Sequence, residues 1–308
     1  MRPNSIEALE IEVHKVESLW RAGDWRGTLD GYCSLFKDRW NHLNGNADSL
    51  TAADLAILER IADLAVPFGQ YKWADQLLEI ATRGYSRLGS AFWADYSTVK
   101  RAHLAFSNSL PYEARILLAT RRATLGDFEA LEFTQEGFIR WETSYQAAPD
   151  SESKTLLFSQ LYIVLGRLLM HLGLYGSALT ALVRGTVHAS ASHLESAAST
   201  LMHLRLAAAQ CLLEKGELQD ASTELGNIER RIEEKKHPGH LTTFLEIQAK
   251  LDLLRGDFGS AQRHLLRVWY TCRERGFVAP ALRAFLNLAQ LLIYLNKTIE
   301  AKTLLTAC

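Results

Sequence analysis

The chain has 308 residues, which is enough for two ordinary globular domains or for one extended array of repeats. Its 34 basic and 35 acidic residues give a net charge of −1, which excludes a global field that would attract nucleic acid or an anionic membrane. Only six prolines, abundant Ala and Leu, and few runs of β-branched residues predict helices almost throughout.

The first part of the chain contains several signals for a turn between two helices. The turn Gly23-Asp-Trp25 comes first, and a loop at residues 42–48 follows, with Ser49 or Thr51 as the expected cap of the next helix. The second turn lies in Gly69-Gln-Tyr71-Lys-Trp-Ala74. A degenerate copy, Ser109-Leu-Pro111-Tyr-Glu-Ala114, follows after 40 residues (69 to 109).

Residues 125–146 interrupt this spacing, because the next turn, at Gly173, lies 64 residues after Ser109. The segment LGDFEALEFTQEGFIRWETSYQ predicts an additional helix. Its Gly126-Asp-Phe128 fits either a turn or the interior of a long helix, and we favour the helix. Residues 147–153 then combine a helix stop with Ser and Asp capping residues. We therefore expect an N-terminal block at residues 1–148 and a C-terminal block at residues 149–308, together forming one continuous solenoid.

The second half of the chain repeats one unit. Residues 161–183 form its best copy, with an apolar helix, a turn at Gly173 and a second helix opening at Ala178. The pattern Gly-x-[aromatic or Leu]-x-x-Ala recurs at Gly216 and Gly256, and Asn replaces Gly at Asn296, so these turns are 40 residues apart. Gly or Asn tolerates the left-handed conformation where a helix stops, and the small Ala lets two helices cross closely. A loop at residues 235–240 separates two of the copies.

The unit resembles the tetratricopeptide repeat (TPR). The positions that match that family are Tyr162, Leu165, Gly166, Gly173, Tyr175, Ala178 and Leu182. The resemblance covers most of the chain, but the 40-residue spacing exceeds the usual period of about 34. This longer period is similar to that of repeats in subunit 5 of the anaphase-promoting complex, in MalT-type regulators and beside CHAT protease domains. The resemblance implies an all-α, right-handed superhelical solenoid of antiparallel helix pairs, whose first helices line a concave groove for partner peptides or helices.

The family's groove positions, carried onto this sequence, give the candidates for partner binding. They are Arg167, Met170, His171, His203, Gln210, Lys250, Arg283, Gln290 and Tyr294, with Ile163, Leu206, Glu214 and Glu246 among their neighbours in the groove. This mixture of cations, amides and apolar groups suits a peptide that carries some acidic groups, and we expect the three cations to be exposed. Ordinary solvated helix faces are an alternative interpretation of equal weight.

No motif predicts catalysis, a cofactor or a metal site. The sequence has no Gly-x-Ser-x-Gly elbow, no phosphate-binding loop and no CxxC pair. Cys33, Cys211 and Cys272 lie in helical apolar patterns and are predicted to be core residues. His188 and His193 are five residues apart, which is not the spacing of two ligands on one helix face. We expect the histidines of residues 188–240 to be surface imidazoles, one of them stabilised at a helix C-terminus.

The same sequence predicts a location and a function. No apolar run reaches membrane-spanning length, and the N-terminus lacks the apolar core of a signal peptide, so we expect a soluble intracellular protein, cytoplasmic or nuclear. We predict a non-catalytic interaction scaffold or adaptor within an intracellular complex, with a protein or peptide partner and neither nucleic acid nor membrane. One alternative is a regulatory arm of a larger enzyme such as a protease. Another is the arm of a peptide-sensing transcriptional regulator, which the absence of a basic DNA-reading helix disfavours.

The last predicted helix pair, around Asn296, has no polar helix after it. Solenoids usually cover their terminal apolar face with such a capping element. We therefore expect this face to be covered by a partner, a further domain or a second copy of the chain.

Overall fold

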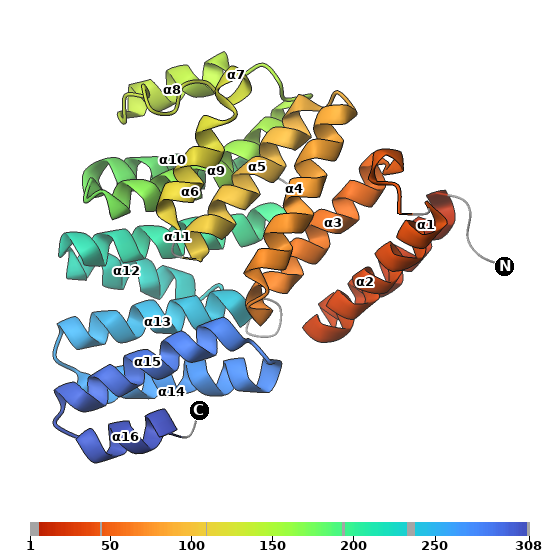
Figure 1. The fold of residues 1–308 in the computed structure, drawn as a ribbon. Coiled ribbons are helices and arrows are strands. Elements are labelled where there is room, and N and C mark those ends of the chain that lie inside the picture. The colour runs from red at the N-terminus through yellow and green to blue at the C-terminus, as the bar shows by residue number, and fades with distance from the viewer. Residues whose placement is uncertain (1–5, 44, 109, 193–194, 233–237, 307–308) are drawn as a thin grey trace. The chain divides into compact units, whose positions relative to one another are not determined.

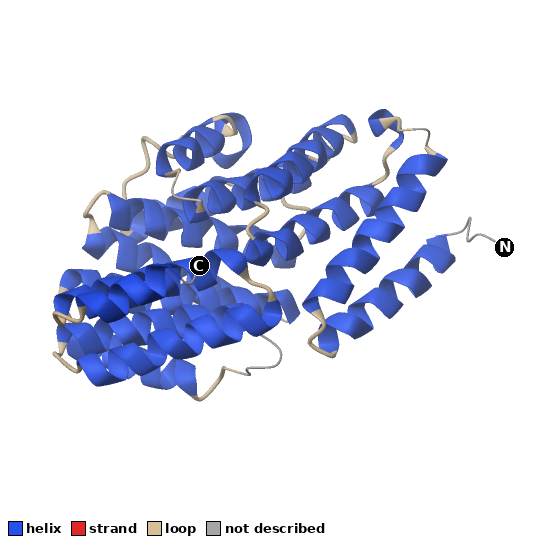
Figure 2. Cartoon of the chain, turned by 60° about the horizontal axis from the view of Figure 1, so that its bottom comes forward, coloured by secondary structure: helices blue, strands red, loops and turns tan. Residues whose placement is uncertain are grey.

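A computed structural model describes residues 6–43, 45–108, 110–192, 195–232 and 238–306, and these residues form helices and connecting loops without any strand (Figures 1 and 2). They divide into two compact units, each described separately below. Unit 1 comprises Met1–Val66 and Gln70–Leu204, and unit 2 comprises Pro67–Gly69 and Arg205–Cys308. The division falls inside one helix, and the boundary expected at residues 148 and 149 stays a prediction.

Unit 1 consists of helix pairs joined by short turns, with two further helices inserted between the third and fourth pairs (Figure 1). Its helices are α1 (Ile6–Arg21), α2 (Trp25–His42), α3 (Ala52–Ala65), α4 (Tyr71–Arg87), α5 (Ala91–Ser107), α6 (Pro111–Ala119), α7 (Arg122–Leu125), α8 (Gln135–Ser144), α9 (Ser151–His171) and α10 (Tyr175–Ala191), with the first half of α11 (Glu195–Lys215). A short 3-10 helix, Ala47–Ser49, precedes α3, and a second, Val66–Phe68, follows it. The partners in α1–α2, α3–α4, α5–α6 and α9–α10 pack along each other, and α5 also packs against α9.

Unit 2 contains the second half of α11 and the helices that follow it. They are α12 (Leu218–Glu229), α13 (Pro238–Leu254), α14 (Phe258–Arg275), α15 (Val278–Tyr294) and α16 (Thr298–Thr306). Each helix from α12 onward packs against the next one along the chain. The buried core between the last two pairs is formed by Ala249, Ala261, Leu265, Leu288, Leu291, Leu292 and Ala301.

The predicted turns are confirmed wherever the structure describes them. The five Gly residues and Asn296 that mark them all have positive φ, between 60° and 89°, whereas Ser109 lies outside the described residues. Asn296, at 60°, is the one non-glycine residue with positive φ in the described chain, and Asn tolerates this region better than most residues do. The Ala that follows each full copy of the turn pattern is at most 2% exposed, as close helix crossing requires.

The helix predicted at residues 125–146 is wrong in extent. α7 stops at Gly126, whose φ of +81° ends the helix, and the Asp127 carboxylate then accepts a hydrogen bond from the Glu129 backbone N–H at 3.1 Å. α8 begins only at Gln135, where the Thr134 hydroxyl accepts from the Gly137 N–H at 3.1 Å. Of the two interpretations of Gly126, the turn is therefore correct.

The N-caps of two helices lie at residues that the sequence predicted as caps. Thr51, rather than Ser49, caps α3 in a capping box with Asp54. Asp150 caps α9, where its carboxylate accepts from the Ser153 backbone N–H at 2.6 Å. The backbone therefore starts a new helix where the polar segment at residues 147–153 predicted one.

A buried carboxylate on α5, Asp95, holds both ends of the segment that contains α7 and α8. It receives hydrogen bonds from Arg121 Nε and Thr124 Oγ1, each at 2.7 Å, and from the Tyr145 hydroxyl at 2.9 Å. Its side chain is fully buried. Burial, followed by the charge and hydrogen bond of Asp95, raises the pKa of Tyr145, so the tyrosine stays a neutral donor. The segment is thus attached to α5 through polar groups at its start and its end.

A second buried carboxylate, Glu142 of α8, joins that helix to α9 and α10. It accepts hydrogen bonds from the Tyr162 hydroxyl at 2.5 Å and from Arg184 Nε and Nη2 at 2.8 and 2.7 Å. His188 Nε2 lies 2.9 Å from the same carboxylate, and its ring stacks on Phe158 and Tyr162. Burial by itself raises the pKa of Glu142, but the hydrogen bonds from Arg184, His188 and Tyr162 outweigh it and lower the pKa to about 2.

The expectation of surface imidazoles is wrong for His188, which is half-buried against these aromatic rings, for His203, which is also half-buried, and for His240, which is only 5% exposed. His193 and His237 lie outside the described residues. The sequence pattern missed these cases because it carries no information on which helix packs over a given face. A histidine beside a buried carboxylate is stabilised by its partner and does not need solvent.

Two helical glycines are expected to respond to Ala in opposite directions. A Cβ on Gly185 of α10 would lie 2.8 Å from the Tyr162 Cβ and 2.6 Å from the Leu204 Cδ2, whereas a Cβ on Gly226 of α12 would meet nothing within 4 Å. Gly185→Ala should lower the free energy of unfolding by about 1–3 kcal/mol through overpacking. Gly226→Ala should raise it by up to about 1 kcal/mol through helix propensity. Urea denaturation of both variants tests this, and a stabilising effect at Gly185 would contradict the close packing of α9, α10 and α11 in unit 1.

Candidate partner-binding surface

The most connected of the predicted site residues is Arg167 of α9. Its Nη1 lies 3.0 Å from His103 Nε2 and 3.4 Å from Ser107 Oγ, both on α5. A guanidinium can only donate, so the His103 ring nitrogen is the acceptor. Burial, reinforced by the charges of Arg167 and Lys100, lowers the pKa of His103 to about 3, which keeps this imidazole neutral at physiological pH. The expectation that Arg167 is exposed is wrong, because its side chain is half-buried against α5.

Further candidates join this group from the neighbouring helices of unit 1. The ring of His203 on α11 meets the ring of His103 edge-on at 6.1 Å, and the ring of His171 meets that of Phe106 at 6.5 Å. Met170 is half-buried on α9. The structure therefore brings Arg167, His171 and His203 together around one side of α5, and we call this set, with His103, Phe106 and Ser107, the α5–α9–α11 surface.

The α5 members of this surface were missed by the sequence reasoning, although a signal for them exists. Arg167 stands six residues before the turn Gly173, and Ser107 stands two residues before the preceding turn position, 109. Lys250 and Glu214 hold the same two places before Gly256 and Gly216, and these two side chains also contact each other. The contact between α5 and α9 thus occupies the same places in the repeat as the contact between α11 and α13.

The candidates of unit 2 are paired within the chain. Lys250 of α13 contacts Glu214 of α11, and Arg283 Nη2 of α15 lies 3.5 Å from Glu246 Oε2 of α13. In both ion pairs the acid lies on the helix that comes earlier in the chain, and the base lies on the later helix. Burial raises the pKa of Glu246, and Arg283 opposes that shift. These two cations are therefore less available to an acidic partner than the sequence suggested.

The remaining candidates of unit 2 do not gather into one cluster. Gln210 is half-buried on α11, whereas Gln290 and Tyr294 of α15 are exposed. The Tyr294 ring lies 5.4 Å from that of Phe258.

Two apolar positions that were predicted to line the groove are buried instead. Ile163 in unit 1 and Leu206 in unit 2 are at most 1% exposed, so the prediction that they line a groove is wrong. A first helix packed by neighbours on several sides buries such positions in the core.

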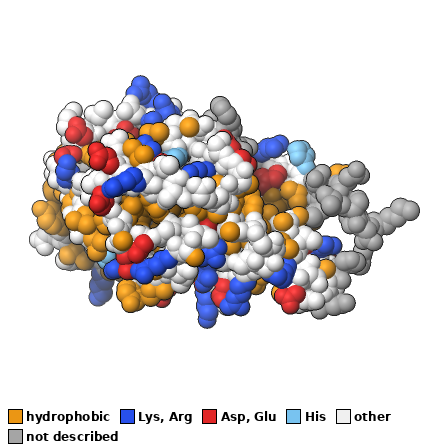
Figure 3. Space-filling view, turned by 90° about the horizontal axis from the view of Figure 1, so that it is seen from above, with side chains coloured by type: hydrophobic (Ala, Val, Ile, Leu, Met, Phe, Trp, Pro, Cys, Tyr) orange, Lys and Arg blue, Asp and Glu red, His pale blue; other side chains and the backbone are white. Residues whose placement is uncertain are grey.

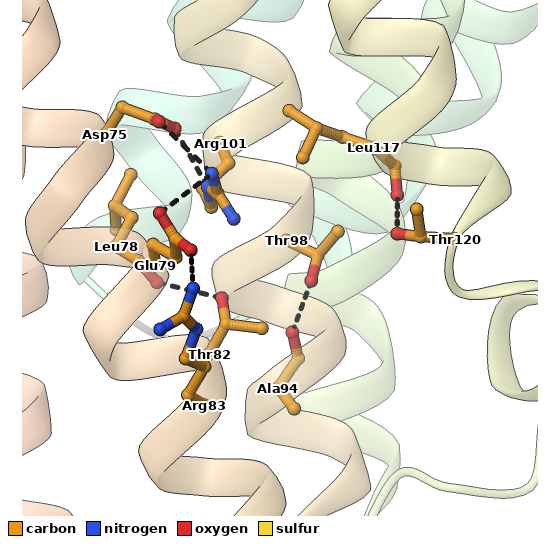
Figure 4. Close-up of polar contacts among 10 residues, drawn as sticks. All are labelled: Asp75, Leu78, Glu79, Thr82, Arg83, Ala94, Thr98, Arg101, Leu117 and Thr120. Atoms are coloured by element: carbon orange, nitrogen blue, oxygen red, sulfur yellow. Dashed lines mark hydrogen bonds and ion pairs between the residues drawn. The ribbon is translucent and has the colours of Figure 1, made fainter.

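A similar acid–base pairing joins α3, α4 and α5. Lys100 Nζ lies 2.7 Å from Asp63 Oδ2, and Arg101 binds Asp75 through Nε and Nη2 at 2.8 and 3.1 Å (Figure 4). Glu79 lies 3.7 Å from Arg101 and also contacts Arg83 (Figure 4). Beside Arg101, an open hollow of about 480 Å³ is lined by residues of α4, α5 and α6. The guanidinium is held by α4 carboxylates, which indicates a structural role in joining α4 to α5.

The distribution of charge agrees with the composition. On the face drawn in Figure 3, basic, acidic and hydrophobic side chains are interspersed over the coloured residues, and no extended field of one sign is visible among them. A surface of this kind recognises partners through local contacts rather than through long-range attraction.

The cysteines are poor candidates for chemistry. Cys211 and Cys272 are fully buried, as predicted, whereas Cys33 is half-buried and Cys308 lies outside the described residues. Burial raises the pKa of the Cys211 thiol to about 11 and that of Cys272 to about 12, so both stay protonated and unreactive near neutral pH. Among the residues that the structure describes, no group of three or more His, Cys, Asp or Glu side chains is placed to hold a metal ion.

Within the described part of the chain, no helix is both long enough and apolar enough to span a membrane.

No family model matches the sequence, and no curated protein matches it. Solved structures do resemble it. A Rap protein complexed with Competence and Sporulation Factor has a TM-score of 0.64 and 11% identity, over 99% of this chain and 75% of that one. Kinesin light chain TPR-like repeats of Podospora anserina give 0.44 and 16%, over 72% and 93%. A tetratricopeptide repeat protein from Parabacteroides merdae gives 0.39 and 12%, over 93% and 99%.

At these identities the likeness concerns the fold alone, and of these three structures the Rap protein is similar enough to support it. The narrower resemblance to repeats with a longer period stays a prediction. The predicted all-α fold of antiparallel helix pairs is confirmed, and it is similar to the fold of the Rap protein.

Proposed function

We propose that this chain is a non-catalytic scaffold or adaptor that holds a segment of a partner protein on the α5–α9–α11 surface, within an intracellular complex. One observation carries the proposal: half-buried polar side chains from three different helices, Arg167, His103 and His203, lie together there. Helices that only needed to pack would place apolar side chains at such contacts.

The chemistry of the surface suits an extended peptide or a partner helix. The Arg167 guanidinium offers several donors in a fixed plane, and a neutral imidazole such as His103 can accept as well as donate. The rings of Phe106 and His171 provide apolar contact area beside these groups. Such a surface can bind the carbonyl or carboxylate oxygens of a partner and cover one of its apolar side chains.

The fold lends general support. The Rap protein of similar fold was solved in complex with another molecule, the Competence and Sporulation Factor. For the present chain, a protein segment is the partner that its mixed surface fits best, because the near-neutral net charge gives no attraction to polyanions.

The proposal is tested by quantitative co-purification with the intact chain as bait. Arg167→Glu should reduce recovery of a specific partner on the order of tenfold or more, because a desolvated arginine at an interface commonly dominates binding. The matched control is Lys250→Gln with Arg283→Gln, which alters two cations that already contact Glu214 and Glu246. Equal recovery by Arg167→Glu and the wild type would show that the surface does not bind the partner. Circular dichroism verifies that the variants are folded, and Arg167→Gln provides a milder second substitution.

A further inference from the structure

Helices α15 and α16 carry a set of large exposed apolar side chains in unit 2. Leu282, Leu286 and Ile293 of α15 are 52%, 47% and 54% exposed, and Leu305 of α16 is 47% exposed. We call these four residues the α15–α16 face. Single exposed apolar residues are common on soluble proteins, but a group on one helix pair marks an interaction surface.

The preceding helix pair shows what normally covers such a face. The turns Gly256 and Asn296 are 40 residues apart, so Leu282 corresponds to Thr242, Ile293 to Leu253 and Leu305 to Leu265. Thr242 and Leu265 are each 2% exposed. Leu253 packs with Leu265 in the core that the two pairs share. The α15–α16 face therefore continues an established interface, and the complementary element is another helix pair or its equivalent.

The charges on the helices of unit 2 indicate which element can cover the α15–α16 face. On the earlier helices, the face that meets the next pair carries an acid, namely Glu214 on α11 and Glu246 on α13, each of which contacts a base of the next first helix. At the corresponding places α15 has Tyr294 and Leu286, which are neutral. Two acidic faces would repel across a two-fold axis, whereas two neutral apolar faces can meet.

We propose that the α15–α16 face binds the same face of a second copy of this chain, with α15 antiparallel to its counterpart across a two-fold axis. Leu282 of one copy then lies near Ile293 of the other, with Leu286 close to the axis. Gln290, exposed on the same helix, can both donate and accept a hydrogen bond, so it can pair with polar groups of the second copy. The α15–α16 face shares no residue with the α5–α9–α11 surface, so this inference does not depend on the function proposed above.

Sedimentation equilibrium of the intact chain tests the proposal. The chain concentration should run from about 1 to about 100 µM, because weak homodimers have dissociation constants of about 10⁻⁶ to 10⁻⁴ M. We expect a monomer–dimer equilibrium in the wild type and at least a hundredfold weaker association in Leu286→Lys. The matched control is Leu172→Lys, at an exposed leucine between α9 and α10, which should dimerise like the wild type. Leu286→Cys, treated with a short bismaleimide, should give a covalent dimer.

Two results would overturn the inference. A wild type that stays monomeric over the whole range leaves the face without the proposed occupant, whatever the variants do. A folded Leu286→Lys that still dimerises, together with no cross-link at Leu286→Cys, would locate the dimer contact elsewhere. Loss of partner recovery in the co-purification experiment, by contrast, would concern only the α5–α9–α11 surface.

Discussion

Glu142→Gln is expected to lower the free energy of unfolding by about 3 kcal/mol. The substitution keeps the size of the side chain but removes the negative charge that the buried ends of Arg184, His188 and Tyr162 share. The half-buried arginine then keeps its charge without a counter-charge, which is the costly half of breaking an ion pair whose acid is buried. Chemical denaturation at pH 7 measures the difference. Glu132→Gln, at an exposed pair with Arg140, is the control and should change the free energy by less than about 0.5 kcal/mol.

The same residue predicts a pH dependence with a definite sign. The pKa of Glu142 is lowered in the folded chain from its ordinary 4.5 to about 2, so the folded state favours the ionised form. Its contribution to stability is therefore fully present above the ordinary pKa and is lost as the pH falls from about 4.5 towards 2. The difference in unfolding free energy between the wild type and Glu142→Gln should shrink over this interval. A difference that stays constant down to pH 2.5 would mean that Glu142 is not held ionised by its partners.

Asp95→Ala is expected to release the segment from Arg121 to Tyr145 and to cost about 3 kcal/mol. The substitution removes the acceptor of Arg121, Thr124 and Tyr145 at once and leaves a buried cavity beside an arginine. Because only this segment loses its attachment, we expect faster hydrogen exchange at residues 122–145, with little change in α13 to α16. Asp30→Ala, at an exposed pair with Arg26 on α2, should leave the exchange unchanged. Uniform destabilisation without a local effect would argue against a separate role for Asp95.

The sequence predicted those parts of the fold that depend on local chemistry. Gly173 and Asn296 end helices because their residue types tolerate positive φ, and Thr51 and Asp150 start helices because their side chains accept backbone hydrogen bonds. These effects act within a few residues and are visible in a single chain. The segment at residues 125–146 was predicted less well, because an apolar pattern did not distinguish one long helix from two short ones separated by Gly126.

The candidate site was predictable in its helices but not in its contacts. Repeat register placed Arg167 and His203 on first helices, and these do meet in unit 1 around α5. The α5 residue His103 escaped notice because its repeat has Ser109 in place of the usual Gly, which weakened the alignment of that helix. Ile163 was misplaced for another reason: α9 is buried along most of its middle, so a position that faces a groove in an average repeat here faces the core.

The acid–base pairs of unit 2 give a negative or a positive charge to the surfaces through which successive helix pairs pack. In unit 2, α11 turns the acid Glu214 towards α13 and α13 turns the acid Glu246 towards α15, and each of these acids meets a base of the later helix. During folding, before the helix pairs have packed together, the acidic surface of α11 or α13 can meet the same surface of another molecule. Two acidic surfaces repel each other, so such a contact does not last. The neutral face of α15 escapes this rule, so repulsion opposes the pairing of like faces at α11 and α13 but not at α15.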